Sequence, residues 1–398
     1  MTPRITVGIA GAGIGGLAAA ALMARAGHEV ALFDQFDAPR PVGSGVVIQP
    51  VGQAVLDRIG AGEKARALGA RITRMLGREV TAGRTVLDVS YDRPDGPQHG
   101  LAMHRSSLFR VLIDGATAAG VPLTTSARIV EAPETAGGRE IICEDGRRHG
   151  PFDLVIDATG VRSRLSPLRG RPLPYGALWS TVPWPAGASL PRDELSQRYR
   201  RADRMLGVLP IGCLPDDPAP LAAIFWSLPA AGLENWRQRP LGDWKAEATA
   251  LWPAFAPFLD TIRQHGDMVP AQYTHGTLAR PVLPALAFVG DAAHRASPQL
   301  GQGANMALLD ALALCVALDR AEGNEALLLY ARMRRWHVRI YQAMSWAFTP
   351  QYQSDSCTLP VLRDRVLMPV SRIPPVPRIL THLVGGHMIP PLAGVAFP

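Results

Sequence analysis

The sequence contains 398 residues, of which 47% are hydrophobic and 19% are charged. This length is more than one small core needs, so one large domain or two fused domains are expected. The composition is typical of a globular protein and excludes a disordered chain. The four cysteines are far apart and form no Cys-x-x-Cys pair. This argues against a zinc site and a disulfide framework, so no metal is expected, and it fits a reducing, cytoplasmic setting.

The net charge of +7 is distributed unevenly along the chain. Residues 331–398 hold eight arginines and two aspartates, which together contribute +6. The favoured interpretation is a solvated helical face followed by a tail, because charge runs usually need no partner. The alternative is a weak attraction to an anionic membrane surface or an anionic substrate. Aromatic residues do not interleave with the basic ones as in a nucleic-acid binder, so no nucleic-acid partner is expected.

The N-terminal stretch could be mistaken for a membrane span. Residues 5–24 contain no charged side chain and include a Gly11-x-x-x-Gly15 spacing. Several glycines within this stretch argue against one continuous helix, because each costs roughly 1 kcal/mol in a helix interior. A strand, a glycine turn and a helix explain the stretch better. No transmembrane segment and no signal peptide are therefore expected.

A dinucleotide-binding fingerprint occupies this stretch in its required context. A strand at residues 4–10 leads into Gly11-Ala12-Gly13-Ile14-Gly15-Gly16, a helix at 17–26, a second strand at 29–33 and then Asp34. Gly11 allows the tight turn, Gly13 lets the backbone approach a pyrophosphate, and Gly16 lets the helix pack on the strand. Asp34 is expected to accept hydrogen bonds from an adenosine ribose, which suits FAD or NAD and would repel the 2′-phosphate of NADP.

Residues 40–170 read as a mixture of helices and short strands. A glycine-rich segment at 40–50 precedes a predicted helix at 51–70, and strands at 73–80 and 84–90 form a hairpin near Gly83. Ser106 is a candidate N-cap for a helix that extends to Ala119. Further strands are predicted at 121–130 and 140–143, and a segment that contains Thr159-Gly160 follows at 152–165.

Residues 171–274 differ in character. Strand-like runs at 175–182, 205–209 and 221–228 alternate in polarity and carry aromatic residues, with many Pro and Gly between them. This pattern predicts a mostly antiparallel sheet, followed by a helix at residues 235–251. Trp179, Trp226 and His275 are candidates to face a substrate, although burial in a core is the default for large aromatic side chains.

The stretch that organises the rest of the chain lies at residues 285–318. A short buried strand at 285–289 ends at Gly290-Asp291, a loop with Pro298, Gly301 and Gly303 follows, and a helix is predicted at 305–318. The Asp291 carboxylate can accept from a sugar or ribityl hydroxyl, and the glycines let backbone N–H groups approach a ligand. The helix N-terminus adds unpaired N–H groups and a partial positive charge. Two more helices are predicted at 332–347 and 360–368.

The run from Gly290-Asp291-Ala292-Ala293-His294 through Pro298 and Gly301-Gln302-Gly303 to Asn305 closely resembles the second FAD-contacting motif of one family. This family is the single-component, FAD-dependent aromatic hydroxylases, the p-hydroxybenzoate hydroxylase-like group A flavin monooxygenases. The resemblance implies an α/β fold (α+β overall): a Rossmann-like FAD-binding domain, an inserted, mostly antiparallel β-sheet substrate domain and a C-terminal helical segment. The implied boundaries are 1–70, 101–170 and 276–330 for the first, 71–100 and 171–275 for the second, and 331–398 for the third.

The resemblance also implies which residues contact the cofactor and the substrate. The expected FAD contacts are Gly11, Gly13, Ile14, Gly15, Gly16, Asp34, Arg40, Gly45, Val46, Arg105, Val130, Gly160, Asp291, Pro298, Gly301, Gly303, Ala304 and Asn305. The expected substrate pocket is formed by Trp179, Trp226, His275 and Pro298. At Thr159 the family carries an Asp linked to FAD and pyridine-nucleotide contacts. This departure leaves FAD binding expected and weakens the expectation of ordinary NAD(P)H handling.

A protein of this family would be an FAD-dependent monooxygenase. NADH or NADPH would act as a transient reductant, and O2 would form a flavin C4a-hydroperoxide that hydroxylates or epoxidises a small aromatic or other unsaturated, hydrophobic molecule. No catalytic base is identified: His275, Tyr273 and His294 are available, and His294 is assigned a structural role within its motif. A monomer or homodimer is expected.

Three alternatives compete with this interpretation. A flavin halogenase is disfavoured, because its Trp-x-Trp motif is absent and only Lys64 and Lys245 are available as its lysine. A flavin-linked dehydrogenase or reductase shares the fold and tolerates Thr159. A non-catalytic relative of the Rab-escort type uses the architecture to bind a lipid or protein partner. Such a protein has no flavin to hold, so Asp34 and Asp291 argue against it.

Overall fold

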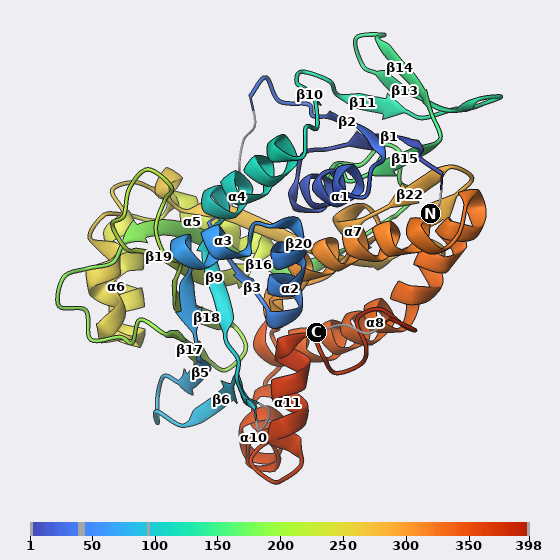
Figure 1. Ribbon diagram of the computed structural model, residues 1–398. Helices are drawn as coiled ribbons and strands as arrows, with labels where there is room; N and C mark the ends of the chain where they lie inside the picture. Colours follow the sequence, from blue (N-terminus) through green and yellow to red (C-terminus); the bar gives the residue numbers. More distant parts are fainter. Residues whose placement is uncertain (1–2, 39–43, 94–95, 396–398) are drawn as a thin grey trace.

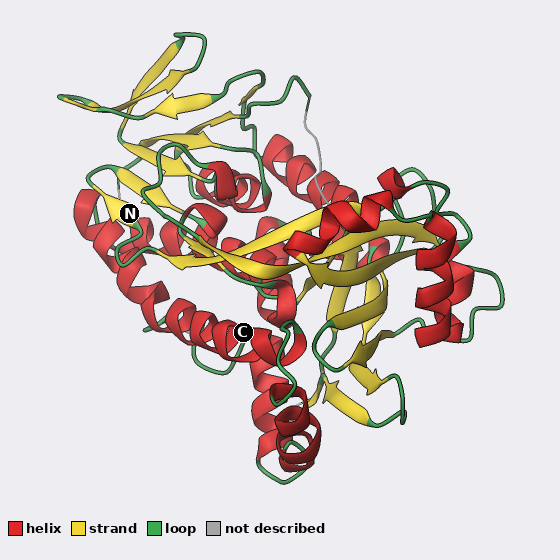
Figure 2. Cartoon of the chain, turned by 180° about the vertical axis from the view of Figure 1, so that it is seen from behind, coloured by secondary structure: helices red, strands yellow, loops and turns green. Residues whose placement is uncertain are grey.

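The computed structural model describes residues 3–38, 44–93 and 96–395. The chain forms a six-stranded and an eight-stranded sheet, and helices cover both (Figures 1 and 2). The predicted mixed α/β class is therefore confirmed. The domain boundaries stay a prediction.

The six-stranded sheet has the order β10-β2-β1-β15-β22-β21. Its first five strands are parallel, and β21 is antiparallel to β22. The strands are β1 (Thr6–Ala10), β2 (Glu29–Phe33), β10 (Leu123–Thr124), β15 (Leu154–Asp157), β21 (Val282–Leu283) and β22 (Leu286–Phe288). Because helices and a small sheet cover both faces, β1, β15 and β22 are almost continuously apolar and buried.

The helices that build the core beside this sheet include α1 (Ile14–Arg25), α2 (Pro50–Ile59), α3 (Gly62–Leu68), α4 (Arg105–Ala118), α7 (Gly303–Arg320) and the first half of α8 (Gly323–Tyr352). α1 packs against both α4 and α7, and its small residues from Gly15 to Ala21 are all buried. The helix predicted at 51–70 is divided into α2 and α3, because Gly60 adopts a left-handed conformation with φ +79° that ends α2. The N-cap of α4 is His104, whose Nδ1 accepts from the Ser106 N–H, and not Ser106 as predicted.

The eight-stranded sheet has the order β23-β20-β16-β19-β18-β17-β5-β6. Its strands are β5 (Arg74–Glu79), β6 (Thr85–Ser90), β16 (Arg171–Pro183), β17 (Glu194–Arg200), β18 (Arg204–Pro210), β19 (Leu221–Pro229), β20 (Val269–Thr277) and β23 (His294–Arg295). All neighbours are antiparallel except β17 and β5. α5 (Leu233–Gln238) and α6 (Leu241–Leu251) cover one face. Pro240 separates these two helices, where one helix was predicted.

Three smaller sheets complete the fold. β3 (Gly45–Ile48) and β4 (Ala70–Ile72) flank β9 (Gly100–His104), and β7 (Asp92–Arg93) pairs with β8 (Gly96–Pro97). The third sheet contains β11 (Ile129–Glu131), β12 (Glu134–Thr135), β13 (Gly138–Cys143) and β14 (Arg148–Phe152). The strand predicted at 121–130 is interrupted, because Ser126 has φ +50° between β10 and β11.

The C-terminal part is helical, as predicted. α8 (Gly323–Tyr352) is longer at both ends than the predicted helix at 332–347. α9 (Leu359–Leu362), a π-helical turn (Arg363–Leu367) and α10 (Met368–Val370) follow one another directly, and α11 (Val376–Gly385) comes next. α10 and α11 project from the body beside β6 (Figure 1). Among the described residues, no helix combines the length and the apolar character needed to span a bilayer.

Candidate functional site

Three turns meet where three neighbouring parallel strands end. β1 is followed by Gly11, β15 by Thr159-Gly160 and β22 by Gly290-Asp291, and these strands are adjacent in the sheet. The short helical turns Gly160–Arg162 and Gly290–Ala292 contact each other. Open parallel sheets bind ligands outside the carboxyl ends of their strands. The candidate site is therefore built on this edge.

The glycines of the first turn are required for different physical reasons. Gly11 has φ +98°, and a Cβ there would lie 2.6 Å from the Ala158 carbonyl oxygen. At Gly16 a Cβ would lie 1.8 Å from the Gly11 carbonyl oxygen, so the fold itself requires both glycines. At Gly13 a Cβ would meet only the Ala158 oxygen, at 4.0 Å, so packing does not explain this glycine. The space it leaves is where a pyrophosphate could reach the N-terminus of α1, so the turn fits a dinucleotide.

Asp34 closes the same turn from the end of β2. Its Oδ2 accepts a hydrogen bond from the Ala12 N–H at 2.7 Å, and its Oδ1 accepts one from the Phe36 N–H at 3.0 Å. A carboxylate has about four acceptor positions, so two remain for the hydroxyl groups of a ribose. The position of Asp34 therefore fits the predicted contact with the adenosine ribose, and that contact stays a prediction.

Asp291 and Arg105 line a recess at the third turn. Both residues are exposed to solvent. Nevertheless, desolvation by the surrounding protein is the largest influence on each: it raises the pKa of Asp291 and lowers the pKa of Arg105. Groups that solvent reaches while protein surrounds them lie in a recess and not on a convex surface. The two charges act on each other, and Arg105 also acts on Tyr273 of β20, so the recess joins both large sheets.

The loop before α7 leaves backbone groups available at the recess. Pro298 and Gly303 are exposed, and Gly301 has a left-handed conformation with φ +61°. Ala304 is half-buried in the first turn of α7. The N–H groups of a first helical turn have no partner inside the helix and carry partial positive charge, so they suit an electron-rich ligand edge.

The Asn305 side chain has a structural role, and its predicted contact with FAD stays a prediction. Its side chain is fully buried. Its Oδ1 accepts from the Gln49 N–H at 2.8 Å, and its Nδ2 donates to the carbonyl oxygens of Val47 and Gly301 at 3.1 and 2.9 Å. The side chain thus clamps β3 and α2 to the loop before α7. Only the backbone of Asn305 is left for a cofactor.

A buried charge network holds the Asp291 loop from behind. Asp310 of α7 accepts hydrogen bonds from the Gly290 N–H (2.9 Å) and from Arg334 Nε (2.8 Å), and its Oδ2 lies 2.6 Å from His294 Nε2. Burial opposes the charge of Asp310, but His294 and Arg334 outweigh burial and lower its pKa to about 2. His294 therefore positions the loop from the protein interior, and it is 7% exposed.

The network continues into the C-terminal segment through His337. Arg334 Nη1 lies 3.2 Å from His337 Nδ1 and donates to the Pro391 carbonyl oxygen at 2.6 Å. His337 Nε2 lies 3.0 Å from the Gly386 carbonyl oxygen. Burial and the positive charge of Arg334 lower the pKa of His337 to about 3. Sequence reasoning missed this network, and the only local signal is that Arg334 and His337 share one helix face at a spacing of three.

The departure at Thr159 has a local explanation. Asp157 is fully buried at the end of β15. Its Oδ1 accepts from the Thr159 N–H (3.0 Å) and hydroxyl (2.6 Å), and its Oδ2 accepts from the Ser163 hydroxyl. The Thr159 side chain therefore satisfies a buried carboxylate instead of pointing into the recess. Gly160 has φ +78°, and a Cβ there would meet nothing within 4 Å, so the backbone stays open to a ligand.

Polar and aromatic side chains gather on one face of the eight-stranded sheet. Trp179 Nε1 donates to the Tyr273 hydroxyl at 2.8 Å, and burial raises the pKa of Tyr273 to about 12. His275 follows Tyr273 by two residues on β20, so both lie on the same face. The Ser345 hydroxyl lies 3.2 Å from His275 Nε2 and 3.1 Å from the hydroxyl of Ser297, which precedes Pro298. Trp179, His275 and Pro298 are thus brought to the same side.

Trp226 is not part of this group. It is 2% exposed and lies among the residues that pack under α5 and α6, with its ring 6.0 Å from that of Trp244 in an edge-to-face contact. Its neighbour Phe225 points to the other face and contacts Trp179, with ring centroids 4.7 Å apart. The position of Trp226 therefore argues against the predicted substrate contact, and its role is in the core.

The surroundings of the remaining predicted FAD contacts indicate less about a ligand. Gly45 of β3 is explained by packing, because a Cβ would lie 2.7 Å from Ile211 and 2.8 Å from Ala223. Gly15 has room for a Cβ, in ordinary contact with neighbouring side chains at 3.4 Å. Ile14, Val46 and Val130 are half-buried, and Val130 lies at an irregular register position between β11 and β13. Arg40 lies outside the described residues.

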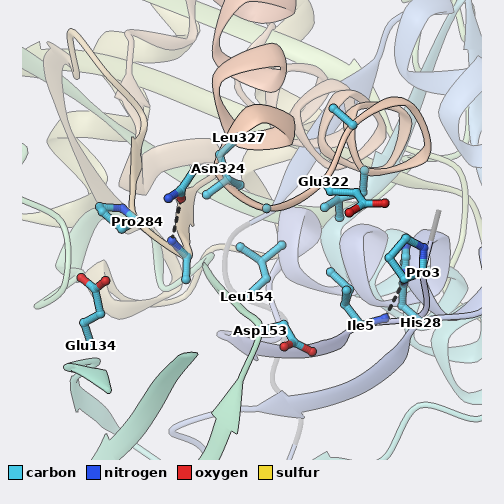
Figure 3. A pocket seen from close by; sticks show the side chains of 14 residues that line it. Pro3, Ile5, His28, Glu134, Asp153, Leu154, Pro284, Glu322, Asn324 and Leu327 are labelled. Atoms are coloured by element: carbon cyan, nitrogen blue, oxygen red, sulfur yellow. Dashed lines mark hydrogen bonds between the residues drawn. The ribbon is translucent and has the colours of Figure 1, made fainter. Parts of the chain in front are cut away.

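A pocket of about 200 Å³ lies at the opposite edge of the six-stranded sheet (Figure 3). Its lining includes Ile5 before β1, Leu154 at the start of β15 and Ala285 before β22. This is the amino edge of the parallel strands. The pocket is therefore separate from the three turns and does not belong to the candidate cofactor site.

Comparisons with known proteins agree with this geometry. The sequence model of one family, described as FAD binding domain, matches residues 4–171 and 284–342. A probable 2-heptyl-3-hydroxy-4(1H)-quinolone synthase of Rhodococcus erythropolis is 30% identical over 396 residues, which cover 94% of this chain and 93% of that protein. The 6-hydroxynicotinate 3-monooxygenase of Bordetella bronchiseptica is 30% identical over 78% of this chain and 82% of its own length.

Solved structures show the same fold. A mutant of 2-methyl-3-hydroxypyridine-5-carboxylic acid oxygenase has a TM-score of 0.76 at 20% identity and covers 93% of this chain and 99% of its own. HpxO of Klebsiella pneumoniae, solved in complex with FAD and uric acid, has a TM-score of 0.78 at 19% identity. It covers 97% of this chain and 98% of its own.

Proposed function

Because the chain belongs to the family of single-component, FAD-dependent aromatic hydroxylases, we propose that it hydroxylates a small aromatic ring with NADH or NADPH as reductant and O2 as oxygen source. The observation that supports this most strongly is the meeting of the glycine turn, Asp291 and the start of α7 at one sheet edge. The face that carries Trp179 and Tyr273 adjoins this edge through Arg105. One site could thus hold both a flavin and a ring.

The cofactor would be held by groups from all three turns. Asp34 would bind the adenosine ribose, the N-terminus of α1 beside Gly13 the pyrophosphate, and Asp291 a ribityl hydroxyl. The first turn of α7 would face the flavin edge that becomes negative on reduction, because a helix N-terminus stabilises negative charge. Bound FAD would supply the redox chemistry that activates O2. The chain itself supplies the position of the cofactor and of the ring.

Two side chains of β20 would position the ring. Burial raises the pKa of Tyr273 to about 12, so its hydroxyl stays protonated near neutral pH and can donate while it accepts from Trp179. Burial also lowers the pKa of His275, so its ring is neutral there and can accept a proton from a substrate hydroxyl. Ser345 contacts His275 Nε2 and would hold the ring in place. We assign positioning to Tyr273 and proton acceptance to His275.

The names of the similar proteins suggest which rings to test first. Those proteins are named for a quinolone and a hydroxynicotinate, which are nitrogen-containing rings with an oxygen substituent. The oxygen substituent donates electron density to such a ring, and this activates it for hydroxylation by this chemistry. We therefore propose an oxygen-substituted heteroaromatic ring as the substrate class. A monomer or homodimer in the cytoplasm remains part of the proposal.

The test is a spectroscopic titration of the purified protein. NADPH or NADH is added without oxygen, in the presence of 4-quinolones or hydroxypyridines, and air is then admitted. A matching ring should accelerate the bleaching of the flavin band, and mass spectrometry should then find a product heavier by one oxygen atom. A flavin that neither nucleotide reduces with any ring would refute the reductant and favour the dehydrogenase or reductase alternative with another electron partner. Rapid reduction that yields only hydrogen peroxide with every heteroaromatic ring would refute the substrate class.

A further inference from the structure

The C-terminal helical projection exposes an unusual amount of apolar surface. The described residues contain thirteen exposed large hydrophobic side chains, and seven of them lie between residues 361 and 379. They are Val361, Leu362, Val366, Leu367, Val370, Ile373 and Ile379, each between 37% and 58% exposed. Scattered single exposed residues need no explanation, but a concentrated group marks an interaction surface.

Four of these residues follow the period of a helix. Leu362 of α9, Val366 of the π-helical turn and Val370 of α10 follow one another at intervals of four residues, and Ile373 lies in the turn that follows α10. We name these four residues the apolar stripe. Most of the apolar stripe lies on continuous helix, so its residues have a defined arrangement.

The inward side of the same helical run is anchored to the body. Arg363 is 2% exposed, and its guanidinium lies over the rings of Tyr199 and Tyr352 at 5.2 and 5.1 Å. It also donates to the carbonyl oxygens of Arg201 and Gln351 at 3.1 and 2.8 Å. Met368 is buried as well. Because this side is held in place, the apolar stripe stays turned away from the body.

Three exposed arginines accompany the apolar stripe. Arg365, Arg372 and Arg378 are exposed. The only acidic residue of the sequence after residue 355 is Asp364, which pairs with the anchoring Arg363 at 2.6 Å. No ion pair joins any of these three arginines to a carboxylate of the described residues, so the surface combines apolar side chains with positive charge.

We propose that this surface docks onto an anionic phospholipid membrane. An apolar helix side flanked by arginines fits the boundary between acyl chains and negatively charged headgroups, and such a helix lies in the plane of the interface. A second copy of the chain fits less well, because a two-fold contact through this surface would bring two sets of the same three arginines together. An acidic protein would match the positive charge of the surface but not its apolar side chains. The inference does not depend on the proposed chemistry, because no residue of the candidate site takes part.

Vesicle flotation of the full-length protein tests the proposal. The protein is mixed with vesicles of phosphatidylcholine and phosphatidylglycerol (3:1) or of phosphatidylcholine alone. It should float with the anionic vesicles only, and binding should fall steeply from 0.05 to 0.5 M NaCl, because salt screens the attraction. Each arginine near an anionic surface contributes about fivefold to binding, so the triple variant Arg365→Gln/Arg372→Gln/Arg378→Gln should bind about a hundredfold more weakly.

Two matched controls distinguish an effect of this surface from the general effect of removing charge or exposed apolar side chains. Arg237→Gln/Arg263→Gln/Arg280→Gln removes the same charge from exposed positions elsewhere and should bind at least ten times better than the first triple variant. Leu362→Gln/Val366→Gln/Val370→Gln should lose at least about tenfold in binding, whereas Val269→Gln/Leu283→Gln/Leu328→Gln, at equally exposed sites, should keep it. Circular dichroism must show that all four variants are folded.

Three results would overturn the proposal. The first is a wild-type protein that stays with the unfloated fraction on anionic vesicles. The second is equal binding by the first triple variant and its control. The third is a concentration-dependent dimer, seen by light scattering, that both surface variants abolish while none of the proteins floats. That last result would assign the apolar stripe to self-association.

Discussion

Replacing His337 by glutamine should remove a defined part of the acid sensitivity of this protein. In the folded chain, burial and Arg334 lower the pKa of His337 to about 3, whereas an unfolded histidine has its ordinary value of 6.5. A group with a lowered folded pKa binds fewer protons folded than unfolded. The contribution of His337 to the free energy of unfolding is therefore fully present above pH 6.5, and it is lost as the pH falls from 6.5 toward 3. At pH 5 the unfolded side chain is protonated and the folded one is not, which costs about 2 kcal/mol at 1.36 kcal/mol per pH unit.

Urea unfolding followed by circular dichroism at pH 7.5, 6.5 and 5.0 measures this effect. His337→Gln should be less stable than the wild type at pH 7.5, because the contacts with Arg334 and Gly386 are altered. Its stability should nevertheless change by about 2 kcal/mol less between pH 7.5 and 5.0. Tyr341→Phe is the control, since it removes a hydrogen bond to the carbonyl oxygen of Leu383 in the same segment without removing a group that titrates in this range. Parallel pH dependences of His337→Gln and the wild type would refute the reasoning.

Three further predictions concern the candidate site. Gly13→Ala should fold with an unchanged melting temperature but bind FAD at least about tenfold more weakly, whereas Gly16→Ala should not fold stably because its Cβ would overlap the Gly11 carbonyl oxygen; equal FAD affinity of Gly13→Ala and the wild type would contradict the pyrophosphate role. Asn305→Ala should cost about 3 kcal/mol in urea unfolding, since it leaves buried partners unsatisfied, while Asn324→Ala at an exposed bond should cost less than about 1 kcal/mol. Trp179→Phe should raise the KM of the substrate with little change in melting temperature, and Trp226→Phe should do the reverse; the same response from both would show that the two faces of the sheet are not functionally distinct.

Local patterns were sufficient for the first strand, glycine turn and helix. The strand is almost entirely apolar, Gly11 has the positive φ of a tight turn, and Gly16 is required by its contact with the Gly11 carbonyl oxygen five residues away. The loop around Asp291 was predictable for the same reason, because its strand, glycines and helix start are continuous in sequence. Where a pattern is complete within about twenty residues, the fold of that piece and its open backbone groups can be inferred.

Tertiary partners decided the rest. Asn305 clamps Val47 and Gln49, more than 250 residues away, and nothing near it in sequence indicates this. Trp179 and Trp226 look alike in sequence, but only the register of the eight-stranded sheet determines which face each occupies. The sequence shows Thr159 as a departure from the family pattern, whereas only the fold brings its hydroxyl to the buried Asp157 carboxylate. The network of Asp310, Arg334 and His337 was unpredictable because its partners come from α7, α8 and the C-terminal segment.

The 30-residue helix α8 has a mechanical consequence for how the enzyme can open. Along its length, the Tyr330 hydroxyl donates to the Phe288 carbonyl oxygen of the six-stranded sheet, and Ser345 contacts His275 of the eight-stranded sheet. Near its end, Tyr352 packs on Tyr199, with ring centroids 5.3 Å apart. A helix of this length is about 45 Å long, and its contacts connect both sheets rigidly. A hinge motion between the sheets would have to bend α8 or break its contacts with one sheet. We therefore expect substrate entry and product release to depend on movements of the loops at the recess.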